Sequence, residues 1–247
     1  MTIAMIFLLF TSGFLSGAVN AIAGGTFLTF GALTLAGLPP ISANATSSVT
    51  QFPGYITSTL AYRNELKEMK RSAIVLGIIS AVGAVGGSLF LISLSNPAFR
   101  SMVPWLLLGA TAIFAAGPKL RPKTKAESHP ASPLGLALQA ITSFYGGFFG
   151  AGMGIMMLAS LGLASGGDYH RLNALKNFLS IVIAAVAIVI FASAGAISWL
   201  HAAIMIPAVA AGGYAGVAMA KKVPQSVLRW MVVAAGLGLA AYYFFTG

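Results

Sequence analysis

No charged side chain precedes Arg63 in this chain. Over the whole sequence 58% of the residues are hydrophobic and 7% are charged, whereas about a quarter of the residues in a soluble domain are charged. Water cannot solvate a surface of this composition, so we expect the chain to lie in a lipid bilayer. The absence of cysteine excludes disulfides, thiolate metal sites and a cysteine nucleophile.

Long apolar runs define the expected membrane segments. They lie at residues 3–36, 42–62, 72–94, 99–118, 134–165, 171–193, 198–220 and 226–246. A spanning helix needs about 20 residues, and the runs 3–36 and 134–165 are too long for one crossing. Glycines interrupt both of these runs in the middle. Because glycine is unfavourable inside helices, each long run is either one broken helix or a pair of half-length helices.

The two long runs also look like one element written twice, 130 residues apart. The matching pairs are Leu8/Leu138, Phe14/Phe144, Gly17/Gly147, Ala21/Ala151, Gly24/Gly154, Leu28/Leu158, Leu33/Leu163 and Gly37/Gly167. Alanine, glycine and leucine are common here, so chance matches are the alternative, but a single gap-free offset favours duplication. We therefore expect a first membrane repeat at 1–118, a polar linker at 119–133 and a second repeat at 134–247. A duplicated, glycine-interrupted membrane segment points to the central binding site of a transporter.

The basic residues help to choose the topology. If each long run enters the membrane and returns, all of the 14 lysines and arginines except Arg100 fall near one face. If each long run crosses once, the basic residues divide almost evenly. Short cytoplasmic loops attract lysine and arginine, so the first arrangement is favoured, with both termini outside. It predicts an all-α polytopic membrane protein with a 5+5 inverted repeat; a 4+4 tandem repeat is the alternative.

Polar residues inside apolar runs need partners or a wet cavity. Asn20 precedes the Gly24-Gly25 break, where backbone N–H groups and a helix N-terminus could meet an anion; tight helix packing is the alternative reading of the glycines. In the second half Lys176 shares a helix face with Asn173 and Asn177. The predicted substrate-binding residues are Asn20, Gly24, Gly25, Thr46, Ser47, Gln51, Gly150, Gly152, Gly154, Asn173, Lys176 and Asn177.

Lys176 is included in this set because it lies well inside an apolar helix. It stands about two turns inside its helix, and the apolar runs contain no acidic residue to pair with it. A transported anion would supply the missing charge. The alternative is a side chain that reaches the cytoplasmic interface. Pro39 and Pro40 end the first long element, and Ser42 is expected to cap the helix that follows. Asp168 is expected to cap the helix from about Tyr169.

Other classes of function find little support in the sequence. No Walker motif, dinucleotide fingerprint or metal-ligand spacing occurs, so we expect no cofactor and no enzymatic activity. An intramembrane hydrolase built on Ser16 and His201 is a remote alternative. The net charge of +10 lies in short loops, so we expect the partners to be lipid and a small anion and not nucleic acid. A homodimer is the oligomeric state that we keep open.

The glycine-rich motifs resemble those of the sulfite exporter TauE/SafE family. The resembling stretches are 17–25 (GAVNAIAGG), 36–47 (AGLPPISANATS), 144–154 (FYGGFFGAGMG) and 171–177 (RLNALKN). The chain departs from the family pattern at Thr26, where the glycine run stops, and at 28–30, where a proline is usual. The resemblance implies an inner-membrane permease for sulfite or an organosulfonate. A passive anion channel is the alternative function.

Overall fold

A computed structural model of the chain describes residues 1–20, 26–120, 132–165, 169–220 and 225–246. All regular structure within these ranges is helical. The helices are α1 (Ile3–Asn20), α2 (Thr26–Leu35), α3 (Pro40–Ala61), α4 (Arg63–Glu68), α5 (Lys70–Ser93), α6 (Asn96–Leu120), α7 (Pro133–Phe148), α8 (Met153–Ser165), α9 (Tyr169–Ser193), α10 (Trp199–Ala220) and α11 (Gln225–Thr246).

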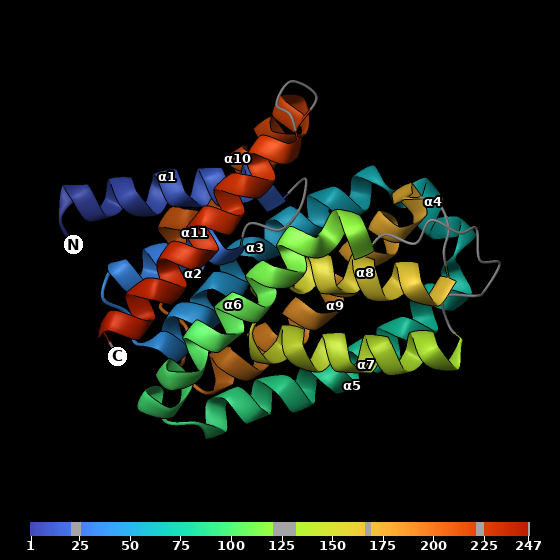
Figure 1. Cartoon of the computed structure of the whole chain (residues 1–247), viewed down its shortest axis with the longest axis horizontal. Helices are drawn as coiled ribbons and strands as arrows, with labels where there is room; N and C mark the ends of the chain where they lie inside the picture. Colours follow the sequence, from blue (N-terminus) through green and yellow to red (C-terminus); the bar gives the residue numbers. More distant parts are fainter. Residues whose placement is uncertain (21–25, 121–131, 166–168, 221–224, 247) are drawn as a thin grey trace.

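Each of the two overlong apolar runs forms a pair of separate helices. Helix α1 has 18 residues and is longer than the expected half-length helix, whereas α2, α7 and α8 have 10, 16 and 13. The run 3–36 becomes α1 and α2, and the run 134–165 becomes α7 and α8. The two members of each pair pack against each other, and Figure 1 shows α7 and α8 side by side as a hairpin. The alternative of a single broken helix is therefore not what forms. The short helix α4, which follows α3, was not expected from the apolar runs.

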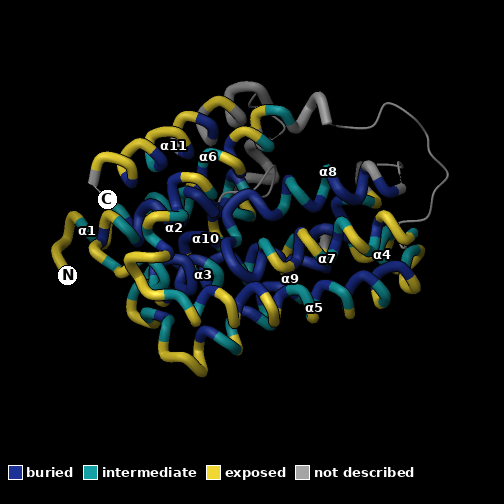
Figure 2. Tube along the Cα trace, turned by 60° about the horizontal axis from the view of Figure 1, so that its bottom comes forward, coloured by how far each residue is buried: buried dark blue, intermediate teal, exposed yellow. Residues whose placement is uncertain are grey.

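The exterior of the molecule is apolar. In the described part of the chain, Ile3–Asn20, Lys70–Ser93 and Arg171–Ser193 are long and apolar enough to cross a membrane. Large apolar side chains such as Phe7 and Trp105 are exposed, and Figure 2 shows exposed residues along the outer helix faces around a buried interior. Exposed side chains of this kind are suited to lipid. The expectation of an all-α membrane protein is confirmed.

The helix pairing crosses between the two halves of the sequence. Helix α1 packs most extensively on α10, and α5 packs on α7; α6 pairs with α11, and α3 pairs with α9. The first pair meets through glycines, because a Cβ on Gly212 would overlap the carbonyl oxygen of Phe14. In the second pair a Cβ on Gly87 would overlap the carbonyl oxygen of Phe144. Glycine thus allows the helix backbones to approach closely at these two crossings.

Helix ends follow local chemistry. Helices α2 and α9 end in Schellman motifs, with Gly37 at φ +89° and Gly195 at φ +66° in the left-handed position that suits glycine. Helix α3 begins at Pro40, whose fixed φ suits the first helical position. Ser42 lies inside this helix, so its predicted capping role is wrong. Asp168, the expected cap of α9, lies outside the described residues.

An aromatic cluster packs around the end of α7. Phe149 meets Phe30 of α2 edge to face at a centroid distance of 5.3 Å, and Phe148 meets Phe99 of α6 at 5.6 Å. All four rings are buried. Edge-to-face pairs of this kind add about 0.5–1.5 kcal/mol each beyond their buried area. The cluster therefore fixes the second hairpin against helices of the first half.

Candidate anion-binding site between the hairpins

The break between α7 and α8 meets the start of α2 in the middle of the molecule. A Cβ built on Gly150 would lie 3.9 Å from Cγ2 of Thr26 and 4.0 Å from Oγ of Ser48. Thr26 is the first residue of α2, so it directly follows the glycine break of the first hairpin. The two interrupted elements that the sequence singled out therefore face each other across a short distance.

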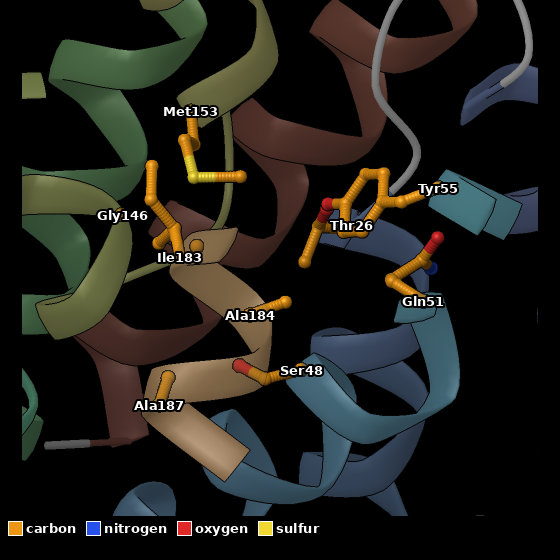
Figure 3. Close-up of a pocket in the computed structure, with 10 residues that line it drawn as sticks. Thr26, Ser48, Gln51, Tyr55, Gly146, Met153, Ile183, Ala184 and Ala187 are labelled. Atoms are coloured by element: carbon orange, nitrogen blue, oxygen red, sulfur yellow. The ribbon is translucent and has the colours of Figure 1, made fainter. Parts of the chain in front are cut away.

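A small cavity lies at this meeting point (Figure 3). Its volume is about 10 Å³, which is room for about one water molecule, so the two halves must move apart before a larger anion can enter. Its polar lining comes from the first half, and its apolar lining comes mainly from α7, α8 and α9 of the second half. The lining residues are Thr26, Ser48, Gln51, Tyr55, Gly146, Gly150, Met153, Ile183, Ala184 and Ala187.

Backbone N–H groups are available at the start of α8. Within the described residues, the N–H groups of Ala151, Gly152 and Gly154 have no hydrogen-bond acceptor. The chain turns here at Gly152, whose φ is +81°. Unpaired N–H groups at a helix start carry partial positive charge and form a ready site for an anion. On the other side of the break, Asn44 of α3 donates to the carbonyl oxygen of Phe148 at 3.0 Å and so holds the end of α7.

Lys176 extends from α9 to this same helix start. Its Cδ lies 3.7 Å from the position of a Cβ on Gly154, and the ammonium group is two bonds further along. The residue is only 6% exposed. Among the described residues no hydrogen bond or ion pair joins its Nζ atom.

Neither of the two described carboxylates forms an ion pair with Lys176. Glu68 pairs with Arg171 at the surface, and Glu65 lies on α4 without an ion pair to Lys176. A buried ammonium without a counter-charge is strongly unfavourable. The Lys176 side chain thus brings a positive charge close to the start of α8, although Lys176 is not among the residues that line the cavity.

A hydroxyl and amide network supports the cavity from the first half. Gln51 Nε2 donates to Ser16 Oγ at 2.6 Å and to Thr29 Oγ1 at 3.3 Å. Thr29 and Ser47 share a hydrogen bond of 2.6 Å between their hydroxyl oxygens. All four residues are buried. The network ties α1, α2 and α3 together directly behind the cavity and fixes the position of the Gln51 side chain.

The remaining predicted residues lie in different places. Thr46 Oγ1 accepts a hydrogen bond of 2.9 Å from the N–H of Ser198, just before α10, and Thr46 is not among the cavity residues. The Asn20 side chain lies beside Gly54 of α3, and both Asn173 and Asn177 are buried on α9 near Lys176. Gly24 and Gly25 lie outside the described residues.

Eight of the ten lining residues are absent from the predicted set, which contributes only Gln51 and Gly150 to the cavity. Ser48 and Tyr55 lie on the same face of α3 as Gln51, at spacings of three and four residues. That spacing was available as a signal once Gln51 had been chosen. Tyr55 of α3 and Thr26 of α2 both line the cavity, and their side chains lie next to each other there (Figure 3). Nothing in the sequence marked Met153, which contributes an apolar side chain next to the helix start.

Interrupted helix pairs that meet around a buried polar site, within an apolar exterior, define a membrane transport protein. The sequence pattern of the sulfite exporter TauE/SafE family matches residues 9–243. The chain therefore belongs to this family, as its glycine motifs led us to expect.

Relatives with assigned names agree with this class. The chain is 26% identical to a "Probable membrane transporter protein" of Haemophilus influenzae, over 94% of this chain and 91% of the relative. It is 24% identical to "Probable membrane transporter protein ORF9" of Sinorhizobium sp, over 94% and 89% of the two chains. The "Probable membrane transporter protein YfcA" of Escherichia coli K12 is also 24% identical, over 91% and 84%. No solved structure matches the chain significantly.

Proposed function

We propose that the protein is a secondary transporter that moves a small sulfur-containing anion, such as sulfite or an organosulfonate, by alternating access. One observation carries this proposal: the buried Lys176 approaches the unpaired N–H groups at the start of α8, and no described carboxylate accompanies it. An oxyanion would neutralise the ammonium group and accept hydrogen bonds from the backbone. The hydroxyl groups of Thr26 and Tyr55 would bind its remaining oxygens.

The proposed architecture is a 5+5 inverted repeat. Under the offset of 130 residues, Phe14 corresponds to Phe144. Phe14 lies against Gly212 of α10, and Phe144 lies against Gly87 of α5. Both α5 and α10 are the fourth of the five membrane segments proposed for each half. The exchanged pairs α1–α10 and α5–α7 are what a two-fold axis in the membrane plane would produce. A binding site on that axis can be opened to either face by moving one half against the other.

We further propose that the basic face is cytoplasmic and that both termini lie outside the inner membrane. Arg63, Lys67, Lys70 and Arg71 cluster around α4, and Arg171 reaches the same place through its ion pair with Glu68. Arg100, near the start of α6, is the basic residue of the opposite face. Lysine and arginine in short loops favour the cytoplasmic side.

Reconstitution of the purified protein in liposomes tests the proposed role of Lys176. Lys176→Met keeps an unbranched side chain and removes the charge. A hydrogen bond to a charged group contributes about 1.5–3 kcal/mol, so the apparent affinity for sulfite should fall roughly 10- to 150-fold. Lys67→Met is the matched control, because Lys67 is exposed on α4, and its uptake should equal that of the wild type.

The same liposomes distinguish the substrates. Uptake of sulfite, sulfate, thiosulfate and 2-hydroxyethanesulfonate is measured for the wild-type protein and both variants. Normal sulfite affinity in a correctly folded Lys176→Met protein would remove this residue from the mechanism. Saturating uptake without a large electrical conductance is the expected behaviour of a transporter, and a large, non-saturating conductance would reject alternating access.

A further inference from the structure

Two buried hydroxyl groups on neighbouring helices have no hydrogen-bond partner among the described residues. They are Thr59 Oγ1 on α3 and Ser180 Oγ on α9. Other hydroxyl groups of α3 behave differently, since Ser48 and Thr57 each donate to a carbonyl oxygen of their own helix at 3.1 Å. An unsatisfied polar group costs several kcal/mol in a membrane interior. The two unpaired hydroxyl groups therefore call for a ligand or water.

Helical spacing places both hydroxyl groups on the faces that bear the site. Thr59 follows Tyr55 by four residues, so it continues the cavity-lining face of α3. Ser180 lies midway between Lys176 and Ala184, four residues from each, on the cavity-lining face of α9. We call this surface the α3/α9 seam; it consists of Gln51, Tyr55, Thr59, Lys176, Ser180 and Ala184.

The two helices of the seam run antiparallel. Arg171, near the start of α9, pairs with Glu68, just beyond the end of α3. At the other end, the N–H of Ser198 donates to Thr46 near the start of α3. With this register the two unpaired hydroxyl groups lie at a similar depth, between the central cavity and the membrane face that bears Arg171.

We propose that the α3/α9 seam is the route by which the anion passes between the central cavity and the face that bears Arg171. Thr59 and Ser180 donate hydrogen bonds to the oxygens of the passing anion, and they bind water when the anion has left. The seam contains no carboxylate, and Lys176 supplies its one positive charge. This inference rests on the proposed transport function, because it assigns a path to that substrate.

A third hydroxyl group provides a matched control. Thr111 Oγ1 of α6 is also buried without a partner. A Cβ on Gly236 of α11 would overlap that oxygen, so Thr111 packs tightly against the backbone of α11. It lines neither the cavity nor the seam. Thr111 and Ser180 are both buried residues, whereas Thr59 is a partly buried residue with a buried oxygen. Thr111 is therefore matched in burial to Ser180 and has no place on the proposed route.

The absence of cysteine allows a direct accessibility test. Thr59→Cys, Ser180→Cys and Thr111→Cys are each introduced as single cysteines, with Asn64→Cys on α4 as the exposed reference. The probes are the anionic 2-sulfonatoethyl methanethiosulfonate and its trimethylammonium counterpart, applied to sealed membrane vesicles of either orientation. Thiol modification needs access of the reagent to the thiolate, so the two seam cysteines should react at least roughly tenfold faster than Thr111→Cys.

Sidedness and charge selectivity complete the test. The seam cysteines should react from the face at which Asn64→Cys reacts. Relative to Asn64→Cys, they should also favour the anionic reagent, because Lys176 lies on the route. Seam cysteines as unreactive as Thr111→Cys from both faces, or reactive from the opposite face alone, would overturn the proposed route.

The labelling experiment tests the route, and the transport experiment tests the role of Lys176, so either proposal can be rejected without the other. Unreactive seam cysteines together with impaired sulfite uptake by Lys176→Met would reject the route and leave the proposed function intact. Anion-selective labelling of the seam together with normal uptake by Lys176→Met would support the route and reject the proposed role of Lys176. Labelling that favours the cationic reagent would reject the seam as an anion path.

Discussion

The sharp turn at Gly152 allows a quantitative test of how the second hairpin is built. Its φ of +81° is a left-handed conformation, and a Cβ there would lie 2.8 Å from Cβ of Ala110 on α6. Gly195 has a similar φ of +66°, but a Cβ on Gly195 would meet nothing within 4 Å. The two glycines therefore share the backbone requirement and differ in the space around them.

The expected losses in the free energy of unfolding follow from the backbone conformation and from the space around each glycine. A left-handed conformation costs an L-residue roughly 1–2 kcal/mol, so Gly195→Ala should lower the free energy of unfolding by about that amount. Gly152→Ala adds an overlap with Ala110, and overpacking of a core costs typically about 1–3 kcal/mol. The total for Gly152→Ala is thus about 2–5 kcal/mol, which leaves a difference of about 1–3 kcal/mol between the variants.

Unfolding by sodium dodecyl sulfate in mixed micelles, followed by circular dichroism, measures both losses against the wild type. Equal losses in the two variants would show that α6 moves aside without cost, and the steric part of the reasoning would then be refuted. A larger loss for Gly195→Ala would refute the whole comparison. Sulfite uptake should fall in Gly152→Ala alone, because this turn presents the N–H groups at the start of α8.

Two further predictions concern packing and surface charge. Gly87→Ala should lower stability by roughly 1–3 kcal/mol, because its Cβ would overlap the carbonyl oxygen of Phe144. Gly109→Ala should instead raise stability by about 0.5–1 kcal/mol, because a Cβ there would meet nothing within 4 Å. Equal effects of the two substitutions in the same unfolding assay would contradict this account of the α5–α7 crossing. Arg171→Gln removes an ion pair whose side chains are 54% and 59% exposed, so its stability loss should stay below about 1 kcal/mol and should shrink as salt is added.

The all-helical fold could be predicted because a lipid bilayer permits few backbone structures. Apolar runs of fixed length become helices, and the runs that were too long divided at their glycines into α1–α2 and α7–α8. The residues at which helices begin and end were harder to predict. Ser42 has a suitable side chain for a cap, but the rigid ring of Pro40 started the helix earlier. The short helix α4 lacks an apolar run and left no periodic signal.

The site was predictable in its outline and not in its detail. Lys176 stood out because charge is unusual in an apolar run, and Gly150 stood out because it interrupts a run too long for one helix. The structure brings both residues to the start of α8 or the cavity beside it. Within the polar cluster of α3, however, sequence order does not say which residues share a partner. Thr46 bonds to the segment before α10, and Ser48 and Tyr55 reach the cavity. Only the tertiary contacts of α3 decide between these roles.

The exchanged pairing of α1 with α10 has a consequence for biosynthesis. Helix α1 is made first, but its main partner begins at Trp199. At about 5–20 residues per second, the intervening chain takes roughly 10–40 s to emerge from the ribosome. During this interval the glycine-lined groove of α1 has only lipid or the insertion machinery to cover it. Nascent chains halted before α10 should thus be preferred targets for membrane proteases, and the last fifth of translation decides whether the first helix is protected from degradation.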